Sequence, residues 1–144
     1  MHSEEKLIKF EMRNLNGKIK GMQETLFDMR GSPVAYIDYD DEDIIFLWNG
    51  SPVAYLDYES NIYGFNGRHL GWFEDGIVWN LNGEKNGFNK DTIAVPVFVN
   101  NEPCRAAKKF KPFRTFKEFT RFKSPKKTTG SSISLAQFLA KGKK

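Results

Sequence analysis

The feature that most constrains this chain is a short motif repeated about five times in tandem over residues 15–90. Aligned on one glycine, the copies read LNGKIKGMQE (15–24), MRGSPVAYID (29–38), WNGSPVAYLD (48–57), FNGRHLGWFE (65–74) and LNGEKNGFNK (81–90). Two copies share the string GSPVAY. Since a single hairpin-sized unit is not stable alone, the copies are expected to share one hydrophobic face.

The shared glycine predicts a tight turn in each copy. Asparagine precedes it in four copies, at Asn16, Asn49, Asn66 and Asn82. Asn-Gly is the strongest short-range signal for a type I′ hairpin, because both turn residues must take a positive φ. Each copy therefore predicts a β-hairpin with a two-residue turn. The turn at Arg30-Gly31 lacks the asparagine and is expected to be wider or of another type.

The apolar residues of each copy predict which face of the hairpin is buried. A large apolar residue stands two positions before each glycine and another five positions after it. Because side chains alternate along a strand, both fall on one face, which is the expected core face. It carries Ile44, Phe46, Trp48, Val53 and Tyr55 in one hairpin, Tyr63, Phe65, Leu70 and Trp72 in the next, and Ile77, Trp79, Leu81 and Phe88 in the last.

The opposite face of each hairpin carries a small residue at a fixed place. These residues are Gly21, Ala35, Ala54, Gly71 and Gly87. A repeated Gly or Ala in a strand indicates a tight bend or the close approach of another backbone.

Tandem hairpins of this kind predict an all-β fold: a pseudo-symmetric flower or shallow barrel with its aromatic faces inward. Closure of the sheet would also remove exposed strand edges. The units NGSPVAYLD, YGFNGRHLGWFEDG and WNLNGEKNGF resemble the 4-fold β-flower family over roughly residues 15–100. The resemblance implies short hairpins arranged as petals around a pseudo-fourfold axis, and it implies no particular activity. The copy around Gly17 is a fifth, degenerate unit, expected to be a flanking strand.

Composition divides the chain into four segments. Residues 1–100 carry 9 Lys/Arg and 16 Asp/Glu, whereas residues 101–144 carry 13 Lys/Arg and 2 Asp/Glu. We expect an N-terminal extension or first strand (1–14), the hairpin-repeat domain (15–101), a basic, Phe-rich segment packed on it (102–127), and a linker with a short C-terminal helix (128–144). A last strand is expected over residues 94–99. The helix is expected over residues 134–139, with Leu135, Phe138 and Leu139 on one side.

The basic segment interleaves its cations with Phe110, Phe113, Phe116, Phe119 and Phe122. One interpretation is that these rings cover the acidic repeat body while Lys/Arg pair with it. The other is an anionic partner: a membrane surface, bound through charge and inserted Phe, or nucleic acid, bound through phosphates and stacking. We expect only the later lysines to be free for a partner, namely Lys126, Lys127, Lys141, Lys143 and Lys144.

Candidate catalytic and metal-binding residues are few. His69 is expected to be an ordinary half-exposed histidine, and Cys104 to be inert. No phosphate-binding glycine loop is present in the sequence. Asp38, Asp57 and Glu74 recur seven residues after the motif glycine, as strand-end solubilising groups or as a ring that binds a cation. We expect no cofactor and no enzymatic activity.

These observations favour a non-catalytic binding or scaffold module. The alternative is a peripheral membrane protein, or one that binds a lipid or small apolar ligand through the tail or an aromatic-lined cavity. Such a cavity would be lined by Trp48, Tyr55, Phe65, Trp72 and Trp79. The first residues show no signal peptide and no stretch is apolar enough to span a bilayer, so a cytoplasmic location is expected.

Overall fold

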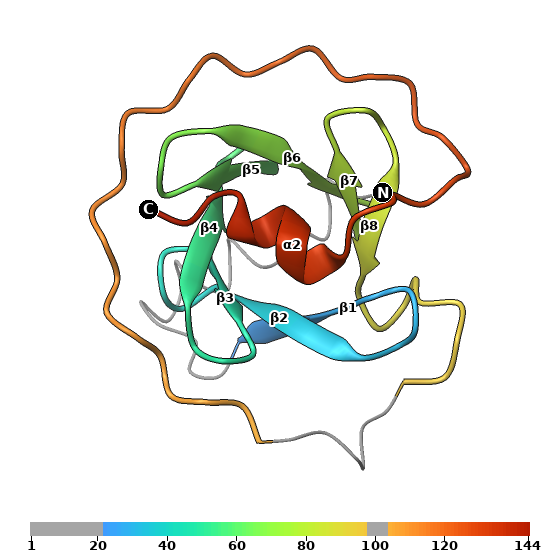
Figure 1. Cartoon of the computed structure of the whole chain (residues 1–144), viewed down its shortest axis with the longest axis horizontal. Helices are drawn as coiled ribbons and strands as arrows, with labels where there is room; N and C mark the ends of the chain where they lie inside the picture. The colour runs from blue at the N-terminus through green and yellow to red at the C-terminus, as the bar shows by residue number, and fades with distance from the viewer. Residues whose placement is uncertain (1–21, 98–103) are drawn as a thin grey trace.

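A computed structural model describes residues 22–97 and 104–144. Within these ranges, the repeat region forms a closed antiparallel barrel in which each strand pairs with its neighbours in sequence and β1 pairs with β8 (Figure 1). The strands are β1 (Gln23–Phe27), β2 (Pro33–Asp38), β3 (Ile44–Leu47), β4 (Pro52–Leu56), β5 (Asn61–Gly64), β6 (His69–Glu74), β7 (Ile77–Asn80) and β8 (Lys85–Phe88). The predicted all-β body of tandem hairpins is confirmed.

The motif glycines form four equivalent loops at one end of the barrel. In each loop, the glycine N–H donates to the carbonyl three residues earlier, as Gly50 N does to Leu47 O at 2.9 Å. The glycine has a positive φ, +90° at Gly50, but the residue before it does not. The predicted type I′ turns are therefore wrong at the Gly50, Gly67 and Gly83 loops, whereas the loop at Gly31, expected to be wider or of another type, is indeed not a type I′ turn. The hydrogen bonds fit a longer loop, in which a turn is followed by a glycine in the left-handed region.

Two of the motif asparagines, Asn49 and Asn66, contribute a side-chain hydrogen bond instead of a positive φ. Asn49 Oδ1 accepts from Ser51 N at 2.9 Å, and Asn66 Oδ1 accepts from Arg68 N at 3.1 Å. Paired positive φ values occur at the other end of the barrel, at Glu42-Asp43 and at Asp75-Gly76. Type I′ geometry therefore belongs to connections that carry no motif asparagine.

Every glycine hairpin contains a β-bulge at the same place. The pairing register skips one residue between the small residue and the loop, so that residue lacks a partner across the ladder. The skipped residues are Val34, Val53, Leu70 and Asn86. Simple alternation predicted that Val53 and Leu70 lie on the aromatic face. Because a bulge interrupts alternation, both residues belong to the barrel interior instead.

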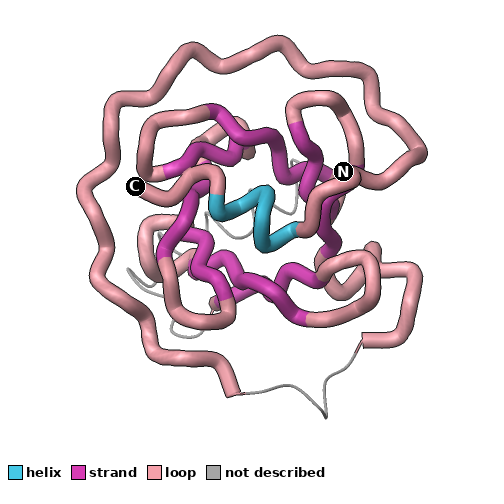
Figure 2. The backbone as a smooth tube through the Cα atoms, in the orientation of Figure 1, coloured by secondary structure: helices cyan, strands magenta, loops and turns pink. Residues whose placement is uncertain are grey.

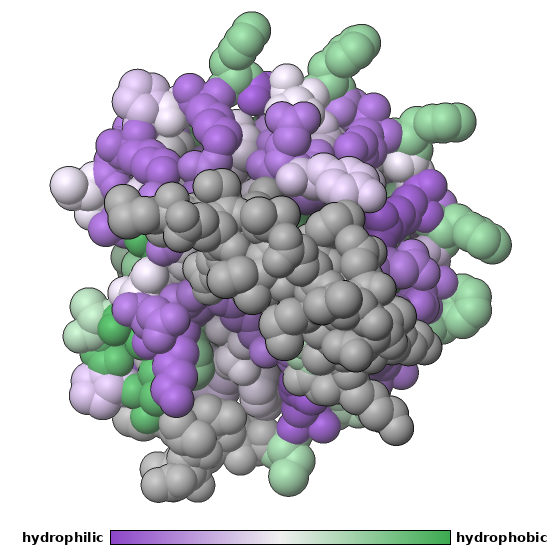
Figure 3. Space-filling view, turned by 180° about the vertical axis from the view of Figure 1, so that it is seen from behind, coloured by the Kyte–Doolittle hydropathy of each residue, from purple (hydrophilic) through white to green (hydrophobic). Residues whose placement is uncertain are grey.

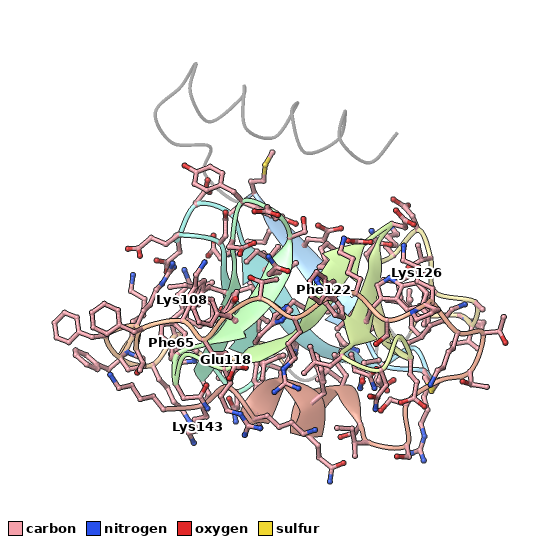
Figure 4. The ribbon with its side chains drawn as sticks, turned by 90° about the horizontal axis from the view of Figure 1, so that it is seen from above. Phe65, Lys108, Glu118, Phe122, Lys126 and Lys143 are labelled. Carbon is pink, nitrogen blue, oxygen red and sulfur yellow. The ribbon has the colours of Figure 1, made fainter. Side chains whose placement is uncertain are left out.

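The helix α2 (Leu135–Ala140) covers one end of the barrel (Figure 4), where it lies across the barrel axis (Figure 2) and directs its buried side chains into the interior. Ser134 caps the helix and forms a capping box with Gln137. Leu135, Phe138 and Leu139 are buried against the aliphatic side chains of the strands, as predicted. None of the helices in the described ranges has the length and apolar character needed to span a bilayer.

The aromatic face of the hairpins points outward, so its predicted inward orientation is wrong. Tyr36, Tyr55 and Tyr63 belong to a second buried cluster that contains no residue of α2. The small residues explain why their own face, and not the aromatic face, points inward: they leave room for the side chains of the helix. A Cβ at Gly87 would lie 2.8 Å from Leu135 Cδ2, and one at Gly71 would lie 3.1 Å from Phe138 Cζ.

After the barrel, residues 104–127 run around its outside without helix or strand, and we call this segment the belt (Figures 1 and 2). Its hydrogen bonds to the glycine loops recur every nine residues. Lys109 N, Glu118 N and Lys127 N donate to the carbonyls of Gly50, Gly67 and Gly83 at 2.8–2.9 Å. The belt thus follows the repeat of the barrel.

Two further expectations concern the ends of the repeat region. The degenerate copy around Gly17, with Gly21, lies outside the described residues. The strand expected over residues 94–99 is not observed where the chain is described, at residues 94–97. Pro96 instead places its carbonyl oxygen beside Gly31, 2.4 Å from where a Cβ would stand.

The close packing inside the barrel gives a first prediction. Gly71→Ala should lower the free energy of unfolding by about 1–3 kcal/mol, as overpacking does, because the new Cβ would lie 1.9 Å from the backbone oxygen of Trp79. Chemical denaturation measures this change. In the matched control Gly130→Ala, the nearest group is the movable end of the Met29 side chain, so the loss should be smaller. Equal stability of the two variants would contradict the packing.

Candidate interaction surface

The belt has a three-residue rhythm that separates its side chains by direction. Lys108, Lys111, Arg114, Lys117, Lys123 and Lys126, all in one register of three, contact carboxylates of the barrel. The register one residue before it holds Phe110, Phe113, Phe116, Phe119 and Phe122, which we call the phenylalanine row. Three residues per turn is the period of a polyproline II helix, in which every third side chain points the same way.

The inward cations meet the carboxylates at the strand ends. Lys108 Nζ lies 2.6 Å from Asp38 Oδ2 and 2.8 Å from Asp41 Oδ2. Lys117 Nζ lies 3.4 Å from Asp57 Oδ2, and Glu74 pairs with Lys123 and Lys126. Asp38, Asp57 and Glu74, the predicted carboxylate ring, therefore each contact their own belt cation. The described residues contain no group of three or more potential metal ligands.

The electrostatic effect of these contacts appears in the titration of Asp41 and Lys108. Burial by itself raises the pKa of the Asp41 carboxyl, but hydrogen bonds from Lys108 and Lys111 outweigh it and hold the pKa below 3.8. Burial likewise lowers the pKa of the Lys108 amine, but hydrogen bonds to Asp38 and Asp41 raise it above its ordinary value. Both groups stay charged at neutral pH, so the ion pairs persist there.

Cations of the belt also lie over the outward aromatic rings. The guanidinium carbon of Arg105 lies 3.9 Å from the ring centroid of Tyr36, and that of Arg114 lies 3.8 Å from the centroid of Tyr55. Lys117 Nζ lies 4.6 Å from the centroid of Tyr63. Such cation–π contacts contribute about 0.5–2 kcal/mol each, more when the pair is desolvated. They cover an aromatic face that would otherwise meet water.

The five aromatic residues predicted to line a cavity lie on this outer side of the barrel. Tyr55, Phe65, Trp72 and Trp79 are buried, and Trp48 is partly buried beneath Arg105. A pocket beside Trp72 and Trp79 has a volume of about 10 Å³, roughly the room of one water molecule. These side chains therefore pack beneath the belt, and the barrel interior that could have held a ligand is filled by side chains of the strands and of α2.

His69 is buried, with only 2% of its surface exposed, so its predicted half-exposure is wrong. The ring stacks on Tyr63 on the outer side of the barrel, not on the small-residue face. Its Nδ1 accepts from Arg121 N at 3.1 Å, and its Nε2 lies 3.1 Å from the carbonyl oxygen of Gly71. Both ring nitrogens thus hold backbone groups in place. Burial lowers the pKa of the imidazole below 6.5.

The phenylalanine row points into solvent, with exposed fractions of 89–101%. Figure 3 shows hydrophobic side chains, in green, that project singly from the rim of the molecule. The interpretation that these rings cover the barrel is therefore wrong, although the Lys/Arg of the same segment do pair with it. The sequence signal for this division is the shared period of three, in which cations and rings occupy different registers.

The lysines predicted to bind a partner differ in their surroundings. Lys126 contacts Glu74 and Asp75 and lies over Trp79, so it belongs to the inward set. Lys144 Nζ donates to the carbonyl of Phe113 at 2.9 Å. Lys127, Lys141 and Lys143 are exposed and form no ion pair with any described residue. In Figure 4, Lys143 lies at the end of the barrel covered by α2.

The buried imidazole gives a second prediction. Below pH 6.5, the unfolded chain protonates His69 more readily than the folded chain does, so the free energy of unfolding should fall as the pH falls from neutral. His69→Gln should lose this part of the pH dependence, even if the variant is less stable throughout. Urea unfolding of both proteins above and below pH 6.5 tests it. Identical pH slopes would contradict the assignment.

Comparison with known proteins addresses the family of the chain. Neither the curated proteins nor the solved structures gave a match. A family model described as "4-fold beta flower protein" matches residues 24–139, which include the barrel, the belt and most of α2. The match covers well over half of the chain, so the protein belongs to the 4-fold beta flower family.

Proposed function

We propose that this protein is a non-catalytic binding module and that the phenylalanine row is its contact surface. The observation that carries the proposal is the exposure of five large apolar side chains in one short segment. Leaving a Phe in water forfeits about 1.5–3 kcal/mol relative to burial. Single exposed apolar residues are ordinary, but a row of them is typical of an interaction site.

The way the belt is held supports this reading. The backbone that carries the row is bonded to the glycine loops, and the flanking cations are paired with carboxylates of the barrel. The rings are therefore presented on an ordered segment. A partner would lose less conformational freedom on binding such a segment than on binding a disordered tail.

An apolar ligand inside the barrel has less support, because side chains of the strands and of α2 fill that space. Catalysis also has less support, since the ring nitrogens of His69 are both engaged with backbone groups. Contact with a membrane surface is the remaining alternative from the sequence, and the phenylalanine row would serve that role as well.

A photo-crosslinking experiment tests the proposal. A photoreactive phenylalanine analogue is placed at Phe116, in the middle of the row, and irradiated in cells that express the protein. We expect discrete covalent adducts, because the row contacts its partner there. The control places the analogue at Tyr58, which is 92% exposed. Tyr58 lies in the connection between β4 and β5, at the end of the barrel opposite the glycine loops that hold the belt. Absence of adducts at position 116, or the same adducts at both positions, would refute the proposal.

A further inference from the structure

We infer that the partner is an anionic lipid bilayer and that the α2 end of the barrel faces it, with the phenylalanine row at the level of the lipid headgroups. This inference rests on the proposed function and adds the chemistry of the partner. Two features support it: the separation of charge between the two ends of the barrel, and the isolated display of the rings.

The acidic residues concentrate at one end of the barrel. The connections after β2, β4 and β6 carry Asp38, Asp40, Asp41, Glu42, Asp43, Asp57, Glu59, Glu74 and Asp75. Antiparallel neighbours place these connections at the end opposite the glycine loops. The inward cations of the belt are directed to these carboxylates, which leaves them unavailable to an anionic partner.

The opposite end, where α2 meets the glycine loops, presents exposed cations. Asn66 of one loop binds the carbonyls of Lys141 and Gly142, which fixes the end of the chain there. The exposed basic residues whose backbone lies at this end include Arg68, Lys109, Arg121, Lys127, Lys141, Lys143 and Lys144. Its carboxylates Asp28, Glu84 and Glu118 each accept hydrogen bonds from the protein. The net character of the α2 end is therefore basic.

The display of the rings favours a bilayer over a shaped partner. The belt that carries the rings runs around the rim of the barrel (Figure 1), and the hydrophobic side chains that project from the rim do so singly, without merging into one flat patch (Figure 3). A protein would need a separate pocket for each ring, whereas a lipid interface accepts each ring independently. Basic residues near an anionic leaflet contribute about 1 kcal/mol each, and stable anchoring takes a second, apolar signal. The basic α2 end supplies the first signal, and the phenylalanine row around the barrel supplies the second.

Nucleic acid fits the same surface less well. Proteins that bind single strands place aromatic rings along a cationic groove, where bases stack on them. Here the rings project singly into solvent, and the cations next to them in the sequence, such as Lys111 and Lys117, contact barrel carboxylates. Binding to nucleic acid in place of vesicles would therefore overturn the inference.

Cys104, the single cysteine, is exposed at the start of the belt and offers a place for a probe. The full chain, labelled there with an environment-sensitive fluorophore, is mixed with vesicles of phosphatidylcholine alone or with added phosphatidylserine. We expect sedimentation with the anionic vesicles only, a blue shift of the probe, and weaker binding as salt is raised. A probe on Tyr58→Cys in a Cys104→Ser background should not shift.

Matched variants separate the two components of the surface. The triple variant Phe113→Ser, Phe116→Ser, Phe119→Ser and the double variant Lys141→Glu, Lys143→Glu should each weaken vesicle binding by about tenfold or more. The control, Tyr58→Ser with Lys90→Glu, changes an aromatic and a cation at the acidic end and should bind like the parent. All substituted positions are exposed, and circular dichroism verifies the fold.

Several results would overturn the inference: binding independent of phosphatidylserine, equal losses in test and control variants, or binding to single-stranded DNA in place of vesicles. Failure of this inference can be distinguished from failure of the proposed function. Protein adducts at position 116 without vesicle binding would leave a binding module whose partner is a protein. Lipid adducts at that position would support both.

Discussion

The packing of α2 against small residues inside the barrel is the constraint on which the rest of the structure depends. Gly71 and Gly87 let the helix approach so closely that an added Cβ would contact Phe138 or Leu135. With the interior filled by side chains of the helix and by aliphatic side chains of the strands, the large aromatic side chains of the strands point outward. An exposed aromatic surface of this size requires a cover, and the belt provides one by placing cations over the rings and against the carboxylates at the strand ends.

The belt and the barrel share one repeat because the glycine loops set the spacing of their contacts. Three of the four loops, those of Gly50, Gly67 and Gly83, accept a backbone N–H of the belt at the glycine carbonyl, and these contacts recur every nine residues. Nine is three turns of a three-residue rhythm, so the same register of side chains faces the barrel at each loop. The cations of that register consequently face inward, and the phenylalanine row faces outward. The exposure of the rings follows from this geometry and not from disorder of the segment.

Simple alternation of strand residues predicted parts of this arrangement and failed at the bulges. The residue skipped in each hairpin reverses the faces toward the loop, which moved Val53 and Leu70 inside and placed His69 beneath the belt. Asn86 occupies the equivalent position in the last hairpin, where its amide donates to Ile133 O at 3.2 Å as the chain enters the barrel. The local sequence pattern does not predict the bulge, because the residues around it have ordinary strand propensity.

The sequence by itself determined the tandem hairpins, the columns of small residues, and the capped helix with its apolar side of Leu135, Phe138 and Leu139, because these depend on neighbours close in the chain. Only the tertiary structure decided which face of the barrel is inside. The alternation of residues along the strands shows that the two faces differ. The helix whose side chains pack in the interior, however, lies about fifty residues beyond the last strand. The inward and outward sides of the belt were decided in the same way, by carboxylates and carbonyls distant in sequence. Long-range contacts of this kind leave little trace in a local pattern, and they set both the buried core and the exposed side of the belt.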